Sequence, residues 1–261
     1  MFTKCSLMMN IALHSNCPSS TWFWDWTESL NQKRFTYMDI GANKGFNINK
    51  VLFALDTSYK TTAKQWKSMF GKDCGVCNDC EENLIKTNKI GKIDIIAIEL
   101  SNLTSKRLKY VLEKQNISAT VFHAAAGHEV GYTFENKIGE GDEDQGISKI
   151  GTPVSMITVD HIMQILMLES IDFLKIDAEG FDKFVLDGAR RVLKEQKIKR
   201  VQFEYHASGE WSRQSLKRVI TMFHNYSYTC FWIGNRGDVI ETTISCLHDF
   251  RRWSNIMCTT N

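Results

Sequence analysis

The chain has 261 residues, which is long enough for one α/β domain with elaborations and short for two complete domains. Apolar residues make up 43% and charged residues 24%, as in ordinary globular proteins, and no apolar run approaches the roughly 18 residues of a membrane span. The net charge of +2 gives no field that would indicate a nucleic-acid partner. The first 16 residues make a poor signal peptide, because their apolar core is thin and interrupted by Asn10, so we expect a cytoplasmic location. Under that expectation three N-x-Ser/Thr sequons are chance matches, at Asn102, Asn116 and Asn225.

The eight cysteines are unevenly distributed, which argues against a secreted disulfide framework and for a local site. Three of them form one cluster with C-x₂-C-x₂-C spacing, Cys74, Cys77 and Cys80. Three thiolates at this spacing can meet one zinc ion, which usually needs a fourth ligand. The candidates for that ligand are Cys17, His14 and Asp79. Free or disulfide-bonded cysteines in an exposed insertion are the alternative to zinc, and an iron–sulfur cluster is disfavoured because Leu84 occupies the position of the next cysteine.

Residues 1–34 carry a dense aromatic patch, made of Trp22, Phe23, Trp24 and Trp26. We expect this segment to pack on the domain that follows. A lid that stacks on a ring-shaped substrate is the alternative. The domain itself is expected to span residues 35–261.

Residues 35–49 predict a strand, a glycine turn and a helix. A short apolar run ends at Asp39, and Gly41 and Gly45 follow it. Apolar residues then recur at i, i+3, i+4 and i+7 from Ile48 to Leu55, which indicates a helix. Doubly wound α/β domains build a nucleotide pocket in this way, since glycines admit a ligand close to the backbone and the helix N-terminus offers free N–H groups. A tight turn with nothing bound is the alternative.

The remaining pattern alternates strands with helices. An insertion at about residues 56–92 precedes the next strand, which is expected at residues 93–99. Further strands are expected at residues 120–126, 154–159, 171–177 and 200–205. Helices are expected at residues 102–116, capped by Asn102 or Thr104, at 181–193, and at 212–226, capped by Ser212. A hairpin of residues 228–233 and 239–243 follows. This order predicts an open α/β sheet with helices on both faces and a C-terminal antiparallel hairpin, the Rossmann-like architecture of class I methyltransferases.

Acidic residues end four of the expected strands, at Asp39, Glu99, Asp177 and Glu204. Ligands bind at that edge of an open α/β sheet, so these carboxylates indicate a site. Glu99 is placed to accept hydrogen bonds from two ribose hydroxyls. Asp39 would repel a pyrophosphate but favour an ammonium and a sulfonium, which favours S-adenosylmethionine over NAD. The loop also reads D-x-G-x-x-x-G rather than G-x-G-x-x-G, which disfavours an NAD-dependent oxidoreductase.

Residues 172–189, D-F-L-K-I-D-A-E-G-F-D-K-F-V-L-D-G-A, resemble the hallmark of the FkbM family of S-adenosylmethionine-dependent methyltransferases. Other motifs agree in order: M-D-I-G-A-N-K-G at 38–45, A-x-x-G at 124–127, T-V-D at 158–160, F-E-Y-H at 203–206 and W-S-N-I-M-C at 253–258. The resemblance covers about residue 36 to the C-terminus and excludes the cysteine insertion.

The resemblance implies roles for particular residues. The expected cofactor residues are Asp39, Gly41, Asn43, Gly45 and Glu99, with Ala125 and Ala126 at the adenine pocket. The expected residues facing methyl donor and acceptor are Asp177, Glu179, Glu204 and His206. FkbM-like enzymes are typically O-methyltransferases, so the expected partner is a hydroxyl-bearing small molecule or glycan.

Methylation of a hydroxyl needs a group that takes its proton, and His206 is a natural general base. Asp177 or Glu179 would instead accept the proton, orient the histidine or hold a divalent cation. Glu179 capping a helix at Gly180, and His206 satisfying only a core hydrogen bond, are alternatives. Methylation of RNA 2′-hydroxyls is another alternative. That chemistry usually relies on a lysine beside acidic residues, and we expect Lys175 to point into the strand, one step from where such a lysine would be needed. A non-catalytic S-adenosylmethionine-binding protein is disfavoured by the intact acidic and histidine positions.

Overall fold

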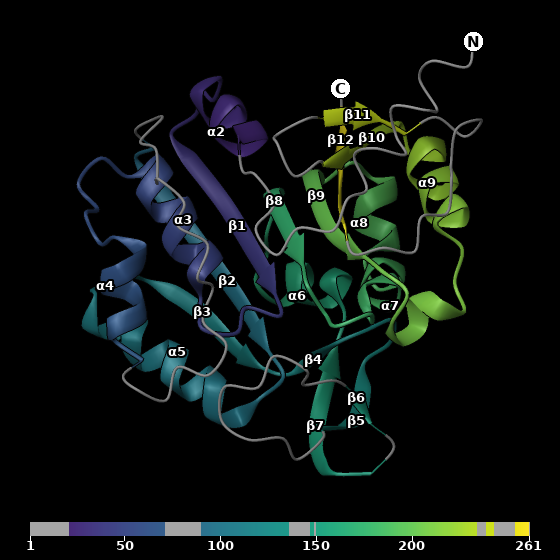
Figure 1. Ribbon diagram of the computed structural model, residues 1–261, viewed down its shortest axis with the longest axis horizontal. Helices are drawn as coiled ribbons and strands as arrows, with labels where there is room; N and C mark the ends of the chain where they lie inside the picture. The colour runs from purple at the N-terminus through teal and green to yellow at the C-terminus, as the bar shows by residue number, and fades with distance from the viewer. Residues whose placement is uncertain are drawn as a thin grey trace.

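The main sheet has eight strands in the order β11-β10-β12-β9-β8-β1-β2-β3 (Figure 1). The computed structural model describes residues 21–70, 90–135, 147–148, 150–233, 239–242 and 254–260. The strands are β1 (Arg34–Ile40), β2 (Lys92–Glu99), β3 (Ala119–His123), β8 (Ile171–Ile176), β9 (Ile198–Tyr205), β10 (Tyr228–Ile233), β11 (Val239–Glu241) and β12 (Ser254–Thr260). This confirms the expected open sheet.

Five of these strands are parallel neighbours, from β3 through β2, β1 and β8 to β9. Their carboxyl ends therefore meet at one edge, as the acidic pattern requires. Strands β10 and β11 pair antiparallel, which confirms the hairpin. The structure adds β12, which runs antiparallel between β9 and β10. The sequence alone predicts no strand at residues 254–260, because the pairing of β12 with β9 and β10 is non-local.

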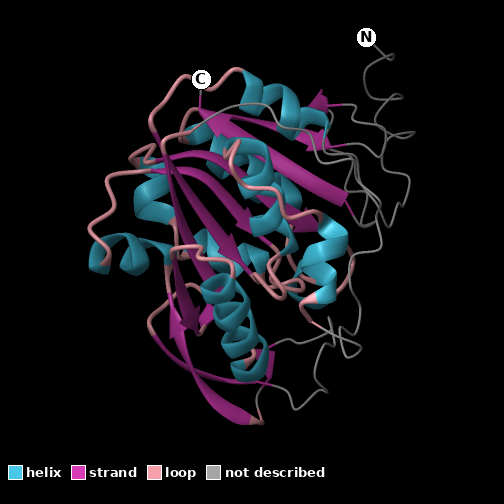
Figure 2. Cartoon of the chain, turned by 90° about the vertical axis from the view of Figure 1, so that its left-hand side faces the viewer, coloured by secondary structure: helices cyan, strands magenta, loops and turns pink. Residues whose placement is uncertain are grey.

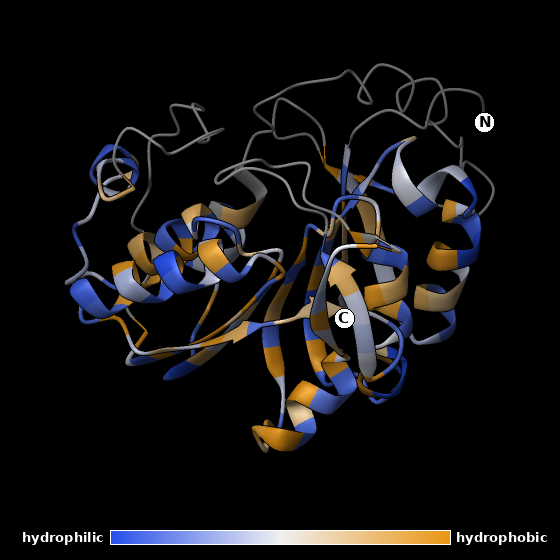
Figure 3. Ribbon diagram, turned by 90° about the horizontal axis from the view of Figure 1, so that it is seen from below, coloured by the Kyte–Doolittle hydropathy of each residue, from blue (hydrophilic) through white to orange (hydrophobic). Residues whose placement is uncertain are grey.

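Helices cover both faces of the sheet (Figures 1 and 2). One face carries α2 (Thr21–Glu28), α3 (Phe46–Leu55), α4 (Ala63–Ser68) and α5 (Asn102–Lys114); the other carries α6 (Val159–Ile165), α7 (Asp182–Asp187), α8 (Arg190–Lys194) and α9 (Leu216–Asn225). Along β1, the side chains of Phe35 and Tyr37 pack in the core beneath α2–α5. Those of Met38 and Ile40 pack in the core beneath α6–α9, so the strand contributes to both faces of the sheet. Figure 3 shows the apolar sides of the helices turned to the sheet. No helix within the described ranges is long and apolar enough to cross a membrane.

A second, four-stranded sheet lies beyond the carboxyl ends of the parallel strands, below them in Figure 1. Its strands, in the order β4-β7-β5-β6, are β4 (Ala125–Ala126), β7 (Thr152–Ile157), β5 (Gly131–Glu135) and β6 (Ile147–Ser148). The expected strand at residues 120–126 is thus divided between the two sheets. The expected strand at 154–159 belongs to the second sheet and pairs with β5.

Three helix expectations need correction. The expected helix 181–193 is broken at Gly188, where a Cβ atom would lie 2.0 Å from the carbonyl oxygen of Gly127, so close backbone packing determines the break. The cap of α5 is Ser101, whose hydroxyl accepts the N–H of Thr104. Ser212 ends a short 3₁₀ turn, Gly209–Ser212, and α9 begins only at Leu216.

The described aromatic residues of the N-terminal segment pack on the sheet, as expected. Phe23 is 3% exposed, and its ring centroid lies 5.8 Å from that of Phe173 on β8. Trp26 packs against Phe35 and Phe173, with the guanidinium of Arg200 4.5 Å from its ring centroid. The side chains of Trp22 and Trp24 lie outside the described residues.

Two of the scattered cysteines are bonded. Cys230 on β10 and Cys258 on β12 are direct antiparallel partners and form a disulfide with a Cα–Cα distance of 4.0 Å. Both are buried in the main core. The uneven distribution of the cysteines argues against a disulfide framework, and this bond departs from that expectation because it depends on the non-local register of β12.

Candidate active site

A buried ion-pair cluster connects β1 and β8 at their carboxyl ends. Asp39 and Lys175 are register partners across the two strands, and Lys175 Nζ lies 3.6 Å from Asp39 Oδ1. The same Nζ donates to Asp177 Oδ2 at 2.9 Å. The expectation that Lys175 points away from the acidic residues is therefore wrong. Residues two apart on a strand share a face, so Lys175 and Asp177 lie together.

Burial and the neighbouring charges shift the pKa values in this cluster in opposite directions. Asp39 is fully buried, which raises its pKa to about 6 although Lys175 acts in the opposite direction. Burial lowers the pKa of Lys175, but the charges of Asp177 and Asp39 outweigh it and leave that pKa raised, so the lysine is cationic. The hydroxyl of Tyr37, on the same strand, also acts to lower the pKa of Asp39. Asp39 thus lies beneath the loop and balances Lys175, whereas the side chain of Asp177 is 30% exposed at the edge.

The glycine loop requires its glycines. Gly41 has φ +71°, and a Cβ there would lie 1.8 Å from the carbonyl oxygen of Asp177. Gly45 has φ +73° and is the N-cap of α3. The N–H groups of Gly41 and Ala42 both donate to the carbonyl of Ile98, which ties the loop to β2. Only a residue without a side chain lets the loop pass this close to the end of β8.

Glu99 connects the loop to the end of β2. Its carboxylate accepts the backbone N–H of Asn43 at 2.7 Å and that of Ser101 at 2.9 Å. The side chain is buried, and burial raises its pKa to about 7 against those two hydrogen bonds. Each carboxylate oxygen keeps a second lone pair, which suits Glu99 to a ribose diol.

Ala125 and Ala126 form β4, which begins beside the end of β2. The N–H of the preceding residue, Ala124, donates to the carbonyl of Glu99 at 3.0 Å. The side chain of Ala125 packs with Val154 and Met156 in the small core of the second sheet. Both alanines are buried, at 2% and 7% exposure.

The end of β9 brings Glu204 and His206 to the same edge. His206 Nδ1 accepts the backbone N–H of Ser208 at 3.0 Å, and its Nε2 lies 4.0 Å from Glu204 Oε2. Burial lowers the pKa of His206, with a smaller opposing contribution from Asp177, so the ring is neutral near pH 7. Because Nδ1 is an acceptor, the proton of the neutral ring resides on Nε2, which therefore donates. Burial, followed by the charges of Asp177 and Asp182, raises the pKa of Glu204 well above its ordinary value.

Asp182 is a site residue that sequence analysis missed. It is fully buried at the start of α7, and its Oδ1 accepts the backbone N–H of Glu204 at 3.2 Å. Burial and the charge of Asp177 raise its pKa to about 7. An acidic residue in the first turn of a helix, five residues after Asp177, was the available signal.

Glu179 lies in a strained turn beside these groups. It is exposed and has φ +49°, and Gly180 follows with φ +85°. A Cβ on Gly180 would lie 2.9 Å from both the Cα of Gly209 and the carbonyl oxygen of Ser208. The helix begins at Asp182 with Phe181 as its N-cap, so the alternative that Glu179 caps a helix at Gly180 is wrong.

No metal centre is found in the described part of the chain, where no three His, Cys, Asp or Glu side chains are grouped to hold an ion. The cysteine cluster, Cys74, Cys77 and Cys80, falls outside the described residues. The active-site cation expected as one alternative has no support from the described carboxylates.

The family model described as the methyltransferase FkbM domain matches residues 39–230, most of the chain. The chain belongs to the FkbM methyltransferase family. Among curated proteins no sequence was found to match it. Its family and its class I fold together support an S-adenosylmethionine-dependent methyltransferase.

This FkbM chain is similar to solved structures of other methyltransferases. Methyltransferase FkbM from Methylobacillus flagellatus superposes with a TM-score of 0.50 and 14% identity, over 88% of this chain and 44% of that one. For the METTL16 MTase domain the TM-score is 0.47 with 12% identity, over 92% and 64%. For an rRNA methylase from Streptococcus thermophilus it is 0.46 with 9% identity, over 92% and 94%. The chain thus spans less than half of the Methylobacillus protein, and identities this low show the fold alone.

Proposed function

We propose that this protein transfers a methyl group from S-adenosylmethionine to a hydroxyl of a sugar or glycan. The observation that carries the proposal is the partly exposed carboxylate of Asp177, which lies where the parallel strands end and is paired with Lys175. Glu204 and His206 converge on the same edge from β9. Methylation of a hydroxyl needs one group that accepts its proton and others that orient its oxygen, and these side chains can supply both.

S-adenosylmethionine supplies the electrophilic methyl group, carried on a sulfonium. Glu99 suits the ribose hydroxyls because each of its oxygens has a lone pair beyond its bond to Asn43 or Ser101. The loop from Gly41 to Gly45 would lie against the cofactor, with the N-terminus of α3 behind it. Asp39, fully buried, acts through Lys175 rather than by contact.

Asp177 is the group we assign to take the hydroxyl proton. Asp182 is fully buried with its pKa raised to about 7, and the pKa of Glu204 is raised well above its usual range. Both are less accessible to an acceptor hydroxyl than Asp177, since Asp182 is fully buried and the side chain of Glu204 is 13% exposed, against 30% for Asp177. Methyl transfer forms the bond from acceptor oxygen to methyl carbon and breaks the bond from sulfur to carbon, while the hydroxyl proton passes to Asp177.

His206 is assigned as a hydrogen-bond donor. Its Nδ1 is engaged by Ser208, which directs the Nε2 proton outward towards Glu204. In this tautomer the ring has no free lone pair with which to accept a proton. Its role would be to orient the acceptor oxygen together with Glu204.

Aromatic rings beside the carboxylates support a sugar as the acceptor. Phe181 and Phe184 have ring centroids 4.6 Å apart, and His128 lies 5.0 Å from Phe184. Both phenylalanines are only partly buried. A sugar ring has apolar faces and polar edges, so an aromatic surface next to hydrogen-bonding groups suits it.

A second candidate function, methylation of an RNA 2′-hydroxyl, is favoured by one observation. Lys175 Nζ lies within 4 Å of both Asp39 and Asp177, the lysine-and-acid grouping on which that chemistry usually relies. Lys175 is only 7% exposed, however, and the chain's net charge of +2 offers little attraction for a polyanion.

An acceptor screen tests the proposal. The protein is incubated with S-adenosylmethionine and matched panels of mono- and oligosaccharides and of capped and uncapped RNA, and products are read by mass spectrometry for an added methyl group. We expect methylated saccharides and unmodified RNA. Methylated RNA with untouched saccharides would replace the first candidate by the second. Calorimetry with S-adenosylmethionine and NAD is the companion measurement, and binding of NAD alone would contradict both.

A further inference from the structure

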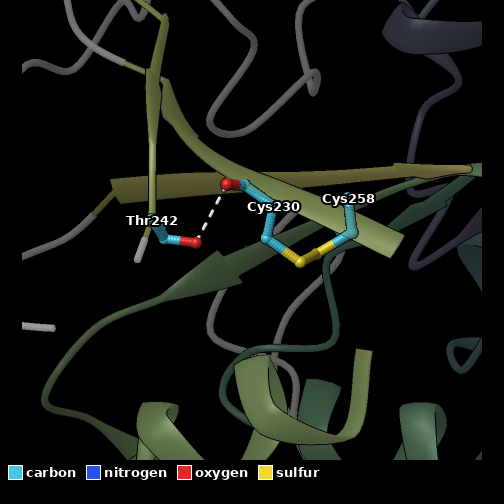
Figure 4. The surroundings of a disulfide bond; sticks show 3 residues. All are labelled: Cys230, Thr242 and Cys258. Carbon is cyan, nitrogen blue, oxygen red and sulfur yellow. Dashed lines mark hydrogen bonds between the residues drawn. A yellow bond between two sulfur atoms is a disulfide. The ribbon is translucent and has the colours of Figure 1, made fainter. Parts of the chain in front are cut away.

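The disulfide between Cys230 and Cys258 joins two strands that are far apart in the sequence. Figure 4 shows it on the inner side of the β10–β12 pair, near Thr242, which donates a hydrogen bond from Oγ1 to the carbonyl of Cys230 at 2.9 Å. Cys230 is 3% exposed and Cys258 is fully buried. Structural disulfides are typical of proteins that fold in an oxidising compartment and are rare in the cytosol.

In eukaryotic cells such a compartment also contains the machinery for N-glycosylation. In a protein that folds there, the three sequons are candidate glycosylation sites rather than chance matches. All three sequon asparagines, Asn102, Asn116 and Asn225, are exposed. An exposed asparagine in N-x-Ser/Thr is the acceptor that this modification requires.

The fold separates the three sequons by position. Asn116 follows α5 and precedes β3 by three residues, and Asn225 ends α9 three residues before β10. Both helices run against the parallel strands, so these two asparagines lie at the amino edge of the sheet, opposite the candidate active site (Figure 1). Asn102 begins α5 three residues after Glu99 and lies at the active-site edge.

We propose that Asn116 and Asn225 carry N-linked glycans, added in the oxidising secretory compartment in which the Cys230–Cys258 disulfide forms. Glycans at these positions leave the candidate active site uncovered. Asn225 also borders an open cavity of about 520 Å³ along α9. The proposal is incompatible with the cytoplasmic location expected from the first 16 residues, and the experiment below distinguishes the two. The inference is independent of which acceptor the enzyme methylates.

The proposal includes two covalent steps, glycosylation of asparagine and oxidation of two thiols, and each needs one co-reactant. Glycosylation forms a bond from the asparagine side-chain nitrogen to C1 of the first sugar. It breaks the bond from C1 to the phosphate of a lipid-linked oligosaccharide, and the amide proton leaves with that phosphate. Disulfide formation removes two protons and two electrons from the thiols of Cys230 and Cys258 and passes them to a thiol–disulfide oxidoreductase.

Analysis of the full chain from the cells that naturally make it tests the proposal. Free thiols are alkylated at lysis, and the protein is digested before and after treatment with peptide N-glycosidase. We expect Asn116 and Asn225 to be converted to aspartate only by the enzyme, and Cys230 and Cys258 to remain linked and unalkylated. Unmodified asparagines, or alkylated Cys230 and Cys258, would overturn the proposal.

Sequon variants expressed in the same cells give a second readout. Ser118→Ala and Asn225→Gln should each remove one glycosidase-sensitive step in gel mobility, and the double variant should remove both. Ser118→Thr and Tyr226→Phe keep their sequons and should migrate like the wild type. If glycosidase treatment shifted the gel mobility of the double variant as much as that of the wild type, neither asparagine would be a glycosylation site.

Discussion

Lys175 and Asp39 are register partners across β8 and β1, with Nζ 3.6 Å from Oδ1 in a region that excludes water almost entirely. Lys175 also bonds to Asp177, so one ammonium group balances a fully buried carboxylate and a partly exposed one. The position of the Asp177 carboxylate therefore depends on a residue that no ligand needs to contact.

The first prediction concerns this pairing. Lys175→Met leaves Asp39 buried without a counter-charge, and we expect a loss of about 3–5 kcal/mol in the free energy of unfolding. The double variant Asp39→Asn/Lys175→Met removes both charges and should lose less than the sum of the single variants. Urea unfolding measures all three, with Lys64→Met on the exposed side of α4 as a control expected within about 0.5 kcal/mol of wild type. Additive losses would show that the two charges do not interact.

The second prediction concerns the proton acceptor. Asp177→Asn keeps the shape of the side chain but removes the carboxylate, so turnover should fall by about 10²–10⁴-fold while affinity for S-adenosylmethionine stays within a few-fold. Single-turnover kinetics and calorimetry measure the two quantities separately. Asp25→Asn, the same chemical change at an exposed position of α2, is the matched control. Near-normal turnover in Asp177→Asn would remove Asp177 from the proposed proton path.

The third prediction separates the two nitrogens of His206. In His206→Asn the amide oxygen can still accept the N–H of Ser208, but the donor at Nε2 is lost. We therefore expect the melting temperature to be nearly unchanged and kcat to fall by about tenfold or more. A variant with normal kcat would limit His206 to shaping the turn after β9.

The sheet and its acidic edge were predictable because they follow from local pattern. Apolar runs mark the strands, and parallel strands bring Asp39, Glu99 and Asp177 to one edge whatever their exact register. The side of the strand on which Lys175 lies was also predictable, since it is two residues from Asp177. The expectation for Lys175 was wrong because it did not apply the period-two alternation of strand side chains.

Other features depend on contacts that no local pattern contains. The place of β12 between β9 and β10, and with it the bond between Cys230 and Cys258, follows from a pairing across 28 residues. The tautomer of His206 depends on how the chain turns at Ser208. The role of Asp182 depends on α7 packing beside the end of β9, where it meets Glu204.

The fourth prediction concerns the cofactor. Glu99→Gln replaces one acceptor oxygen by an amide group, which would face the N–H of either Asn43 or Ser101. We expect affinity for S-adenosylmethionine to fall by about 10- to 100-fold, because hydrogen bonds to a charged group are worth about 1.5–3 kcal/mol. Glu113→Gln, an exposed change on α5, carries the same charge difference and should bind normally. Equal affinities in calorimetry would rule out contact between Glu99 and the cofactor.

The last prediction links Asp182 to the pH dependence of stability. Burial raises its pKa to about 7 from an ordinary 3.8, so the folded state favours the protonated form. The stabilisation is fully present below about pH 4 and is lost as the pH rises through about 7; the two pKa values correspond to about 4 kcal/mol. Asp182→Asn cannot ionise, yet its amide oxygen can still accept the N–H of Glu204. The wild type should therefore lose more stability than Asp182→Asn between pH 5 and pH 8, as measured by urea unfolding. Parallel stability curves for the two proteins would show that Asp182 is ionised in the folded state throughout.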